Sequence, residues 1–72
     1  MILYEIYRIT DTYFDKILDL IGAFTSLSVA KEKLEEHREA DGEGNNYQYY
    51  KIMEVPVDNP NAAKCVLRSP AE

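Results

Sequence analysis

The stretch YFDKILDLIGAF, residues 13–24, decides the fold, because its composition is compatible with two different secondary structures. Its apolar residues fit helical spacing, and Thr12 stands where a helix N-cap would stand. Against a helix, Gly22 lies within the apolar run, and residues 25–26 supply a new helix start directly afterwards. We therefore predict a loop followed by a strand over about residues 18–25.

The segment that begins at Ser26 has a clear helical pattern. Its polar positions include Lys31, Glu32, Lys33, Glu35, Glu36, Arg38 and Glu39, which we expect to face water. Its apolar stripe consists of Leu27, Ala30 and Leu34, with His37 in line. The glycine- and asparagine-rich residues 42–46 are predicted to end the helix and form a polar loop.

Two further segments have the composition of strands. Residues 2–9 and residues 47–57 are rich in β-branched and aromatic side chains. Pro56 cannot donate to a strand ladder, so we expect the end of the second segment to lie at a sheet edge. Residues 65–67 could add a short extra strand or clasp an edge.

These elements predict one α+β domain in the order ββαβ, a three-stranded antiparallel sheet with one helix on one face. We assign this domain to residues 1–58 and regard residues 59–72 as a C-terminal tail. A chain of 72 residues with 46% hydrophobic and 29% charged residues fits a single small globular core.

The charge balance bears on partners and location. Eight basic and thirteen acidic residues give a net charge of −5 and an isoelectric point near 4.7. Such a surface repels nucleic acid and anionic membranes, so we expect no direct contact with either. The chain shows no basic leader and no apolar stretch of membrane-spanning length, which favours a cytoplasmic protein.

Candidate residues for chemistry are few. One histidine and one cysteine cannot make a spaced metal motif, so we expect no metal and no cofactor. His37 could activate Cys65 as a thiolate, but the alternative of an ordinary helix residue and a small, partly buried apolar residue is favoured. The exposed helix carboxylates are interpreted as solvated charge, and we expect no catalytic residue and no enzyme.

Tyrosine is the unusual feature, with six in the chain and no tryptophan. Neighbouring strand positions point to opposite faces, so either Tyr49 or Tyr50 should lie outside the core. Tyrosine suits protein interfaces and small-ligand pockets, although strands are rich in aromatics anyway. The predicted interaction residues are Tyr7, Tyr47, Tyr49, Tyr50 and Met53.

A homo-oligomer is a further expectation, because the first strand is apolar on both faces and one helix can cover only one of them. We predict a dimer joined through the sheet, with Leu3, Tyr7, Ile21 and Met53 at the contact. The alternative is that residues 13–17 and residues 66–67 fold back over that face of the same chain.

Short motifs along residues 2–58 also support a resemblance. They are Ile21-Gly22-Ala23-Phe24-Thr25-Ser26, then Ala30, Glu32 and Lys33, then Tyr50, Ile52, Glu54, Val55, Val57 and Asp58. This layout resembles that of small accessory proteins of bacteriophages and prophages, and it departs from them in residues 13–17 and around Cys65. The resemblance implies a ββαβ fold and an accessory role such as inhibition of a host defence factor, in the host cytoplasm.

Two functions remain open from the sequence. The first is a non-enzymatic protein that binds and blocks a partner protein. The second is a homo-oligomer that binds or sequesters a nucleotide signal, with bases stacked on Tyr47, Tyr49 or Tyr50.

Overall fold

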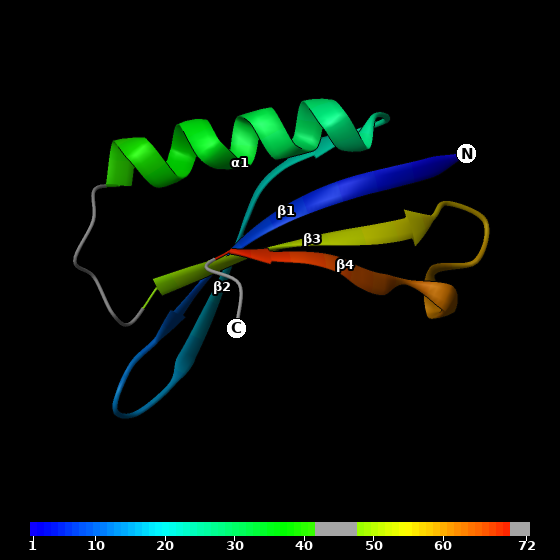
Figure 1. Ribbon diagram of the computed structural model, residues 1–72. Coiled ribbons are helices and arrows are strands. Elements are labelled where there is room, and N and C mark those ends of the chain that lie inside the picture. The colour runs from blue at the N-terminus through cyan, green and yellow to red at the C-terminus, as the bar shows by residue number, and fades with distance from the viewer. Residues whose placement is uncertain (42–47, 70–72) are drawn as a thin grey trace.

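The computed structural model describes residues 1–41 and 48–69, and Figure 1 shows the arrangement of the elements. The strands are β1 (Ile2–Asp11), β2 (Lys16–Phe24), β3 (Gln48–Pro56) and β4 (Lys64–Ser69). Helix α1 (Leu27–Asp41) lies between β2 and β3 in the chain, and a single 3₁₀ turn, η1 (Pro60–Ala62), precedes β4. The predicted loop at residues 42–46 lies outside the described residues.

The four strands form one antiparallel sheet in the order β2-β1-β3-β4, and α1 lies across one of its faces (Figure 1). The predicted α+β class and the ββαβ order are confirmed, and the possible extra strand is present as β4. Residues 64–69 therefore belong to the same sheet, where β4 pairs with β3 along the edge.

Strand β2 resolves the ambiguity of residues 13–24 in favour of a strand. The preceding turn closes locally, because the Thr12 amide donates to the Asp15 carbonyl at 2.8 Å and the Asp15 amide donates to Thr12 Oγ1 at 2.9 Å. Thr12 therefore caps a hairpin turn and not a helix. Within β2 the pairing with β1 shifts by one residue at Ile21, which makes a β-bulge.

The core lies between α1 and the sheet. Its fully buried residues come from β1, α1 and β3, and they are Ile6, Ala30, Leu34, Tyr50 and Ile52. The helix stripe was thus predicted correctly for Ala30 and Leu34, whereas His37 is exposed. Partly buried side chains close the core at its margin, namely Tyr4, Ile21, Phe24, Leu27 and Leu67.

The prediction that Pro56 marks a sheet edge was wrong. Strand β3 is an interior strand, with β1 on one side and β4 on the other. Pro56 is tolerated because it is the last residue of β3, and the pairing with β4 extends only to Glu54 opposite Lys64. No helix among the described residues is long and apolar enough to cross a membrane.

Candidate functional site

The face of the sheet opposite α1, here called the helix-free face, has no described element packed across it (Figure 1). Ile6 and Ile52 are opposed in the register and both belong to the core under α1. Because side chains alternate along a strand, their odd-numbered neighbours point to the other side. On β1 and β3 the helix-free face therefore carries Leu3, Glu5, Tyr7, Ile9, Tyr49, Lys51, Met53 and Val55.

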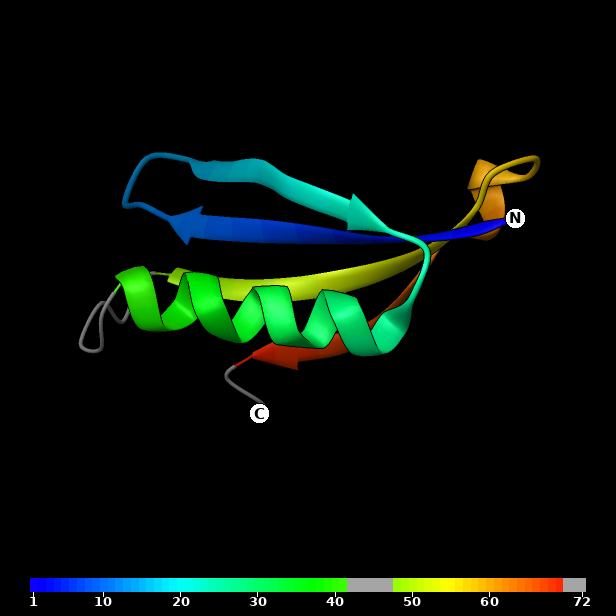
Figure 2. The ribbon, with the colours of Figure 1, turned by 90° about the horizontal axis from the view of Figure 1, so that it is seen from above.

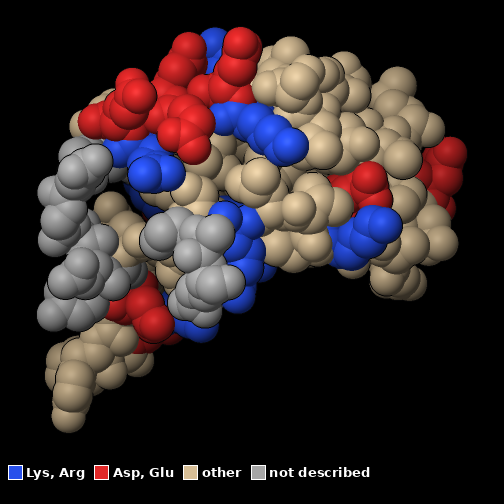
Figure 3. All heavy atoms as spheres, in the orientation of Figure 1, with Lys and Arg blue, Asp and Glu red and all other residues tan. Residues whose placement is uncertain are grey.

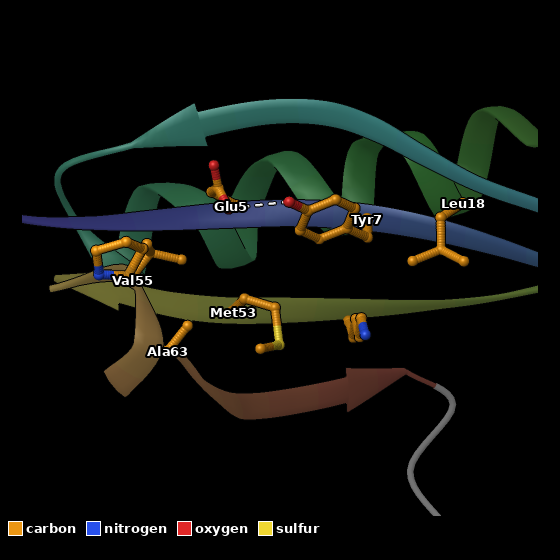
Figure 4. Close-up of a pocket in the computed structure, with 8 residues that line it drawn as sticks. Glu5, Tyr7, Leu18, Met53, Val55 and Ala63 are labelled. Carbon is orange, nitrogen blue, oxygen red and sulfur yellow. Dashed lines mark hydrogen bonds between the residues drawn. The ribbon is translucent and has the colours of Figure 1, made fainter. Parts of the chain in front are cut away.

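A shallow hollow of about 350 Å³ lies on this face. Its walls come from β1, β2, β3 and the segment around η1, and they are formed by Glu5, Tyr7, Leu18, Lys51, Met53, Val55, Pro60 and Ala63. Figure 4 shows these side chains in front of the sheet, with the helix behind it. Apolar atoms make most of the lining, so the hollow suits an apolar group better than a charged one.

Tyr7 stands at the centre of this face with its hydroxyl fixed. The hydroxyl donates a hydrogen bond to Glu5 Oε1 at 2.9 Å (Figure 4). Burial raises the pKa of Tyr7, and the hydrogen bond to Glu5 and the negative charge of Glu5 raise this pKa further. The ring therefore stays neutral and presents an apolar surface at physiological pH.

Two cations lie against tyrosine rings on the same face. Lys51 Nζ is 5.8 Å from the centre of the Tyr7 ring, and the Arg68 guanidinium carbon is 5.4 Å from the centre of the Tyr49 ring. Lys51 and Arg68 are opposed in the register of β3 and β4, so the two positive charges are neighbours. The helix-free face is thus apolar at its centre and cationic along the β3–β4 side.

A group of acidic side chains lies over α1, as Figure 3 shows. There Lys33 pairs with Glu36 at 3.2 Å and Arg38 with Glu35 at 3.5 Å along the exposed helix surface. Such exposed pairs contribute little to stability. The exposed surface of α1 is therefore one acidic surface of the protein.

The structure brings most of the predicted site residues together. Tyr7, Tyr49 and Met53 lie on the helix-free face, and Leu3 lies there too by its position in β1. Tyr47 lies outside the described residues.

Two predicted positions need correction. Tyr50 is 4% exposed and packs in the core under α1, so its ring is not available to a partner. Ile21 packs against that same core, on the side of β2 that also carries Ile17 and Asp19. Neither residue therefore belongs to a contact on the helix-free face.

Sequence reasoning missed several residues of this face. Lys51 and Val55 could have been found, because strand alternation places them beside Tyr49 and Met53. Arg68 could not, since its position depends on a second register shift, at Ile52 and Met53, between β3 and β4. The alternative to the predicted dimer, a cover from residues 13–17, is not seen, because Tyr13 and Phe14 at the tip of that loop are exposed to solvent.

The two candidate residues for nucleophilic chemistry lie apart. His37 is on the exposed surface of α1, whereas Cys65 is opposite Met53 in the register and therefore on the helix-free side. Cys65 is exposed and not partly buried as expected, and its thiol donates to the Leu67 carbonyl at 3.4 Å. The sheet separates the imidazole from the thiol. Within residues 1–41 and 48–69, no group of three or more histidine, cysteine or carboxylate side chains could hold a metal ion.

Comparisons with known proteins add nothing to this geometry, because no family model, no curated protein and no solved structure matches the chain. The function is therefore argued from the helix-free face itself.

Proposed function

We propose that this protein is a non-enzymatic binding protein that docks its helix-free face on a partner protein and thereby blocks part of that partner's surface. The observation that carries the proposal is the apolar hollow around Tyr7 and Met53, with Lys51 in its lining and Arg68 beside Lys51. An interface of this kind has an apolar aromatic centre and a polar rim.

The apolar centre supports a protein partner. Tyr7 and Met53 belong to residue types that are enriched at protein interfaces, and both are only partly covered by their own chain. The Tyr7 ring is held by its bond to Glu5 and by the neighbouring Lys51, so little side-chain entropy is lost when a partner covers it.

The charges indicate the chemistry of the partner. Lys51 lines the hollow and Arg68 lies beside Lys51, whereas a group of acidic side chains lies over α1. A partner with an apolar patch next to carboxylates complements this face and is repelled by the opposite one. We propose a protein of that kind in the cytoplasm of a host cell, consistent with the resemblance to phage accessory proteins.

Paired capture experiments test the proposal. Wild-type protein and the variant Met53→Glu are immobilised and exposed to bacterial lysates, and proteins retained only by the wild type are purified and titrated. The matched control is Val29→Glu, which places the same charge at an exposed apolar position on α1. We expect Met53→Glu to weaken binding by about tenfold or more and Val29→Glu to leave it unchanged.

Charge reversal of the two cations provides a second test of the proposal. Lys51→Glu and Arg68→Glu should each weaken binding, and the affinity of the wild type should fall as salt is raised. A partner that binds Met53→Glu as well as wild type, or that is lost with Val29→Glu, would place the contact elsewhere and refute the proposal.

A nucleotide ligand is the second candidate, favoured by the two cation–tyrosine pairs. Lys51 and Arg68 could accept a phosphate while a base stacks on Tyr7 or Tyr49. Arg8 does not lie beside Lys51 and Arg68, since it pairs with Asp19 at 3.3 Å on the face of the sheet that is opposite to the helix-free face.

Thermal unfolding with cyclic and linear nucleotides separates the two candidates. A nucleotide at 100 times its Kd should raise the midpoint by about 10–20 °C in a domain of this size. The shift should disappear in Arg68→Glu if the phosphate is held by Lys51 and Arg68. No shift with any nucleotide leaves the protein partner as the function.

A further inference from the structure

Strand β2 is an edge strand with an unusual surface. Along its outer side it pairs with no other strand within the described residues, because it is the terminal strand of the sheet. Three of its side chains are about half exposed, namely Ile17 at 48%, Leu18 at 52% and Leu20 at 56%. Figure 2 shows this part of the β1–β2 hairpin lying beyond the cover of α1.

This hairpin segment has large apolar side chains on both faces, with the charged Asp19 beside Ile17 on one of them. Leu18 and Leu20 are opposed to Ile9 and Tyr7 and lie on the helix-free side, whereas Ile17 is opposed to Thr10 and lies on the other side. An edge strand that exposes large apolar side chains is a template for pairing with another chain. The outer side of β2 is therefore suited to pair with a further strand.

The other edge of the sheet is protected in the usual ways. Strand β4 has only six residues, carries the exposed cations Lys64 and Arg68, and is interrupted by a register shift. These features discourage pairing with another chain. Between Ile17 and Leu20, β2 has a single charge, Asp19, which is engaged inward with Arg8. The β4 edge therefore disfavours pairing with another chain, and the β2 edge lacks this protection.

We propose that the occupant of the β2 edge is a second copy of this chain, paired β2 to β2 across a two-fold axis perpendicular to the sheet. Such an axis makes the two β2 strands antiparallel. It also places the helix-covered faces of both copies on the same side of the joint sheet. The result is one continuous sheet of eight strands with both helices on the same side. Both helix-free faces then remain open on the opposite side.

The charges select the register. Centring the axis on Lys16 or on Asp19 would oppose that charged residue to itself, and centring it on Ile17 would oppose Asp15 of one copy to Asp19 of the other. Like charges directly opposed across strands are destabilising. Centring the pairing further along β2 would run it into the bulge at Ile21.

One register remains, with Leu18 opposite Leu18 of the second copy. It places Lys16 opposite Leu20 and Ile17 opposite Asp19, so that no like charges face each other within Lys16–Leu20. The bulge at Ile21 then marks the end of the regular pairing.

The tip of the hairpin extends the contact. Tyr13 and Phe14 are 95% and 92% exposed, and their rings are packed edge to face with centres 5.0 Å apart. The Leu18-centred register brings this tip toward Gly22 and Ala23 of the second copy, the two smallest residues of β2. Two aromatic side chains can bury about 300–500 Å² per copy, a large part of the about 800 Å² per partner of a stable interface.

Mass measurement by light scattering tests the dimer directly. We expect twice the 8.3 kDa of one chain at high micromolar concentration. Leu18→Lys and Leu18→Glu should each give a monomer, and an equimolar mixture of the two should restore the dimer, since only a residue opposed to itself on the axis behaves in this way. Val66→Lys, at an exposed position on β4, is the control that should keep the dimer.

A second pair of variants tests the register from the other side of the strand. Ile17→Glu should dissociate the dimer because it faces Asp19 of the second copy, whereas Ile17→Lys should retain it. In the unaltered protein, hydrogen exchange of β2 amides should slow as concentration rises, and exchange in β4 should not.

A mass of one chain at every concentration overturns the proposal. So does a dimer that survives Leu18→Lys but is lost with Tyr7→Glu, because that result would place the contact on the helix-free face. A mass of one chain at every concentration does not bear on whether the helix-free face binds a partner protein, which is measured by capture and titration.

Discussion

Ile52 and Met53 are consecutive residues of β3 on opposite faces of the sheet, and truncating each to alanine should have different consequences. Ile52 is fully buried in the core under α1, opposite Ile6, so Ile52→Ala leaves a cavity. Such truncations cost about 2–5 kcal/mol. At about 0.05–0.15 kcal/mol per residue, a chain of 72 residues has a total stability of about 4–11 kcal/mol. Ile52→Ala should therefore remove about a fifth of it or more.

Met53 is only partly buried and borders the open hollow, so Met53→Ala leaves no enclosed cavity. We expect a loss of at most about 1 kcal/mol in stability. Partner binding should show the reverse order, because Met53 supplies contact surface and Ile52 does not. A comparison of the two variants therefore separates the effect on folding from the effect on binding.

Urea and thermal unfolding measure the first quantity. A loss of about 3 kcal/mol should lower the midpoint of Ile52→Ala by about 12–24 °C, and Met53→Ala should shift it by only a few degrees. If Met53→Ala destabilises the protein as much as Ile52→Ala does, the helix-free face is covered by the protein's own chain. The reasoning behind the binding face would then be refuted.

Three smaller predictions follow from local geometry. The protonated Tyr7 hydroxyl stabilises the fold below about pH 10 and loses this effect as pH rises through its raised pKa, so Tyr7→Phe should flatten the alkaline fall in stability measured by unfolding. If the two alkaline curves coincide, the bond to Glu5 is unimportant. In Gly22→Ala the new methyl group would lie 3.0 Å from Phe24 Cε2, so a net loss of about 1 kcal/mol is expected, and a more stable variant would contradict this. Ser26→Ala should cost about 0.5–1 kcal/mol in urea unfolding, since its hydroxyl accepts from the amide three residues on at 3.5 Å; no change would mean that this long bond does not cap the helix.

The sequence allowed the elements to be predicted because local patterns carry that information. A glycine in an apolar run and a helix start at residues 25–26 were enough to distinguish strand from helix in residues 13–24. What could not be predicted was the face on which each β2 residue lies. The bulge at Ile21 reverses the alternation, and a bulge is set by long-range pairing and not by neighbours in the chain.

The same limit applies to the candidate site. Tyr7, Tyr49 and Met53 were found because they share one face of two regular strands. Tyr50 was misassigned to the surface because composition alone does not tell which of two adjacent tyrosines faces the helix. The neighbouring charges of Lys51 and Arg68 depend on the pairing of β3 with β4, which brings together residues far apart in the chain.

The proposed dimer and the proposed binding face make a joint prediction, because the two-fold axis leaves both helix-free faces on one side of an eight-stranded sheet. A dimer can then engage two partner molecules fixed on one surface, and the second contact forms at high effective concentration. Ile17→Glu should produce a monomer without altering the hollow, because Ile17 lies on the opposite side of β2 and does not line it.

On a surface densely coated with partner, we expect the apparent affinity of this monomer to fall by about 100-fold or more relative to wild type. In solution, with partner free and dilute, the affinity per site should be unchanged, and Ile17→Lys should behave as wild type in both formats. Equal affinity of Ile17→Glu and wild type on the coated surface would show that the two faces do not act together. A loss of affinity in solution as well would show that the β2 edge is itself part of the partner's contact.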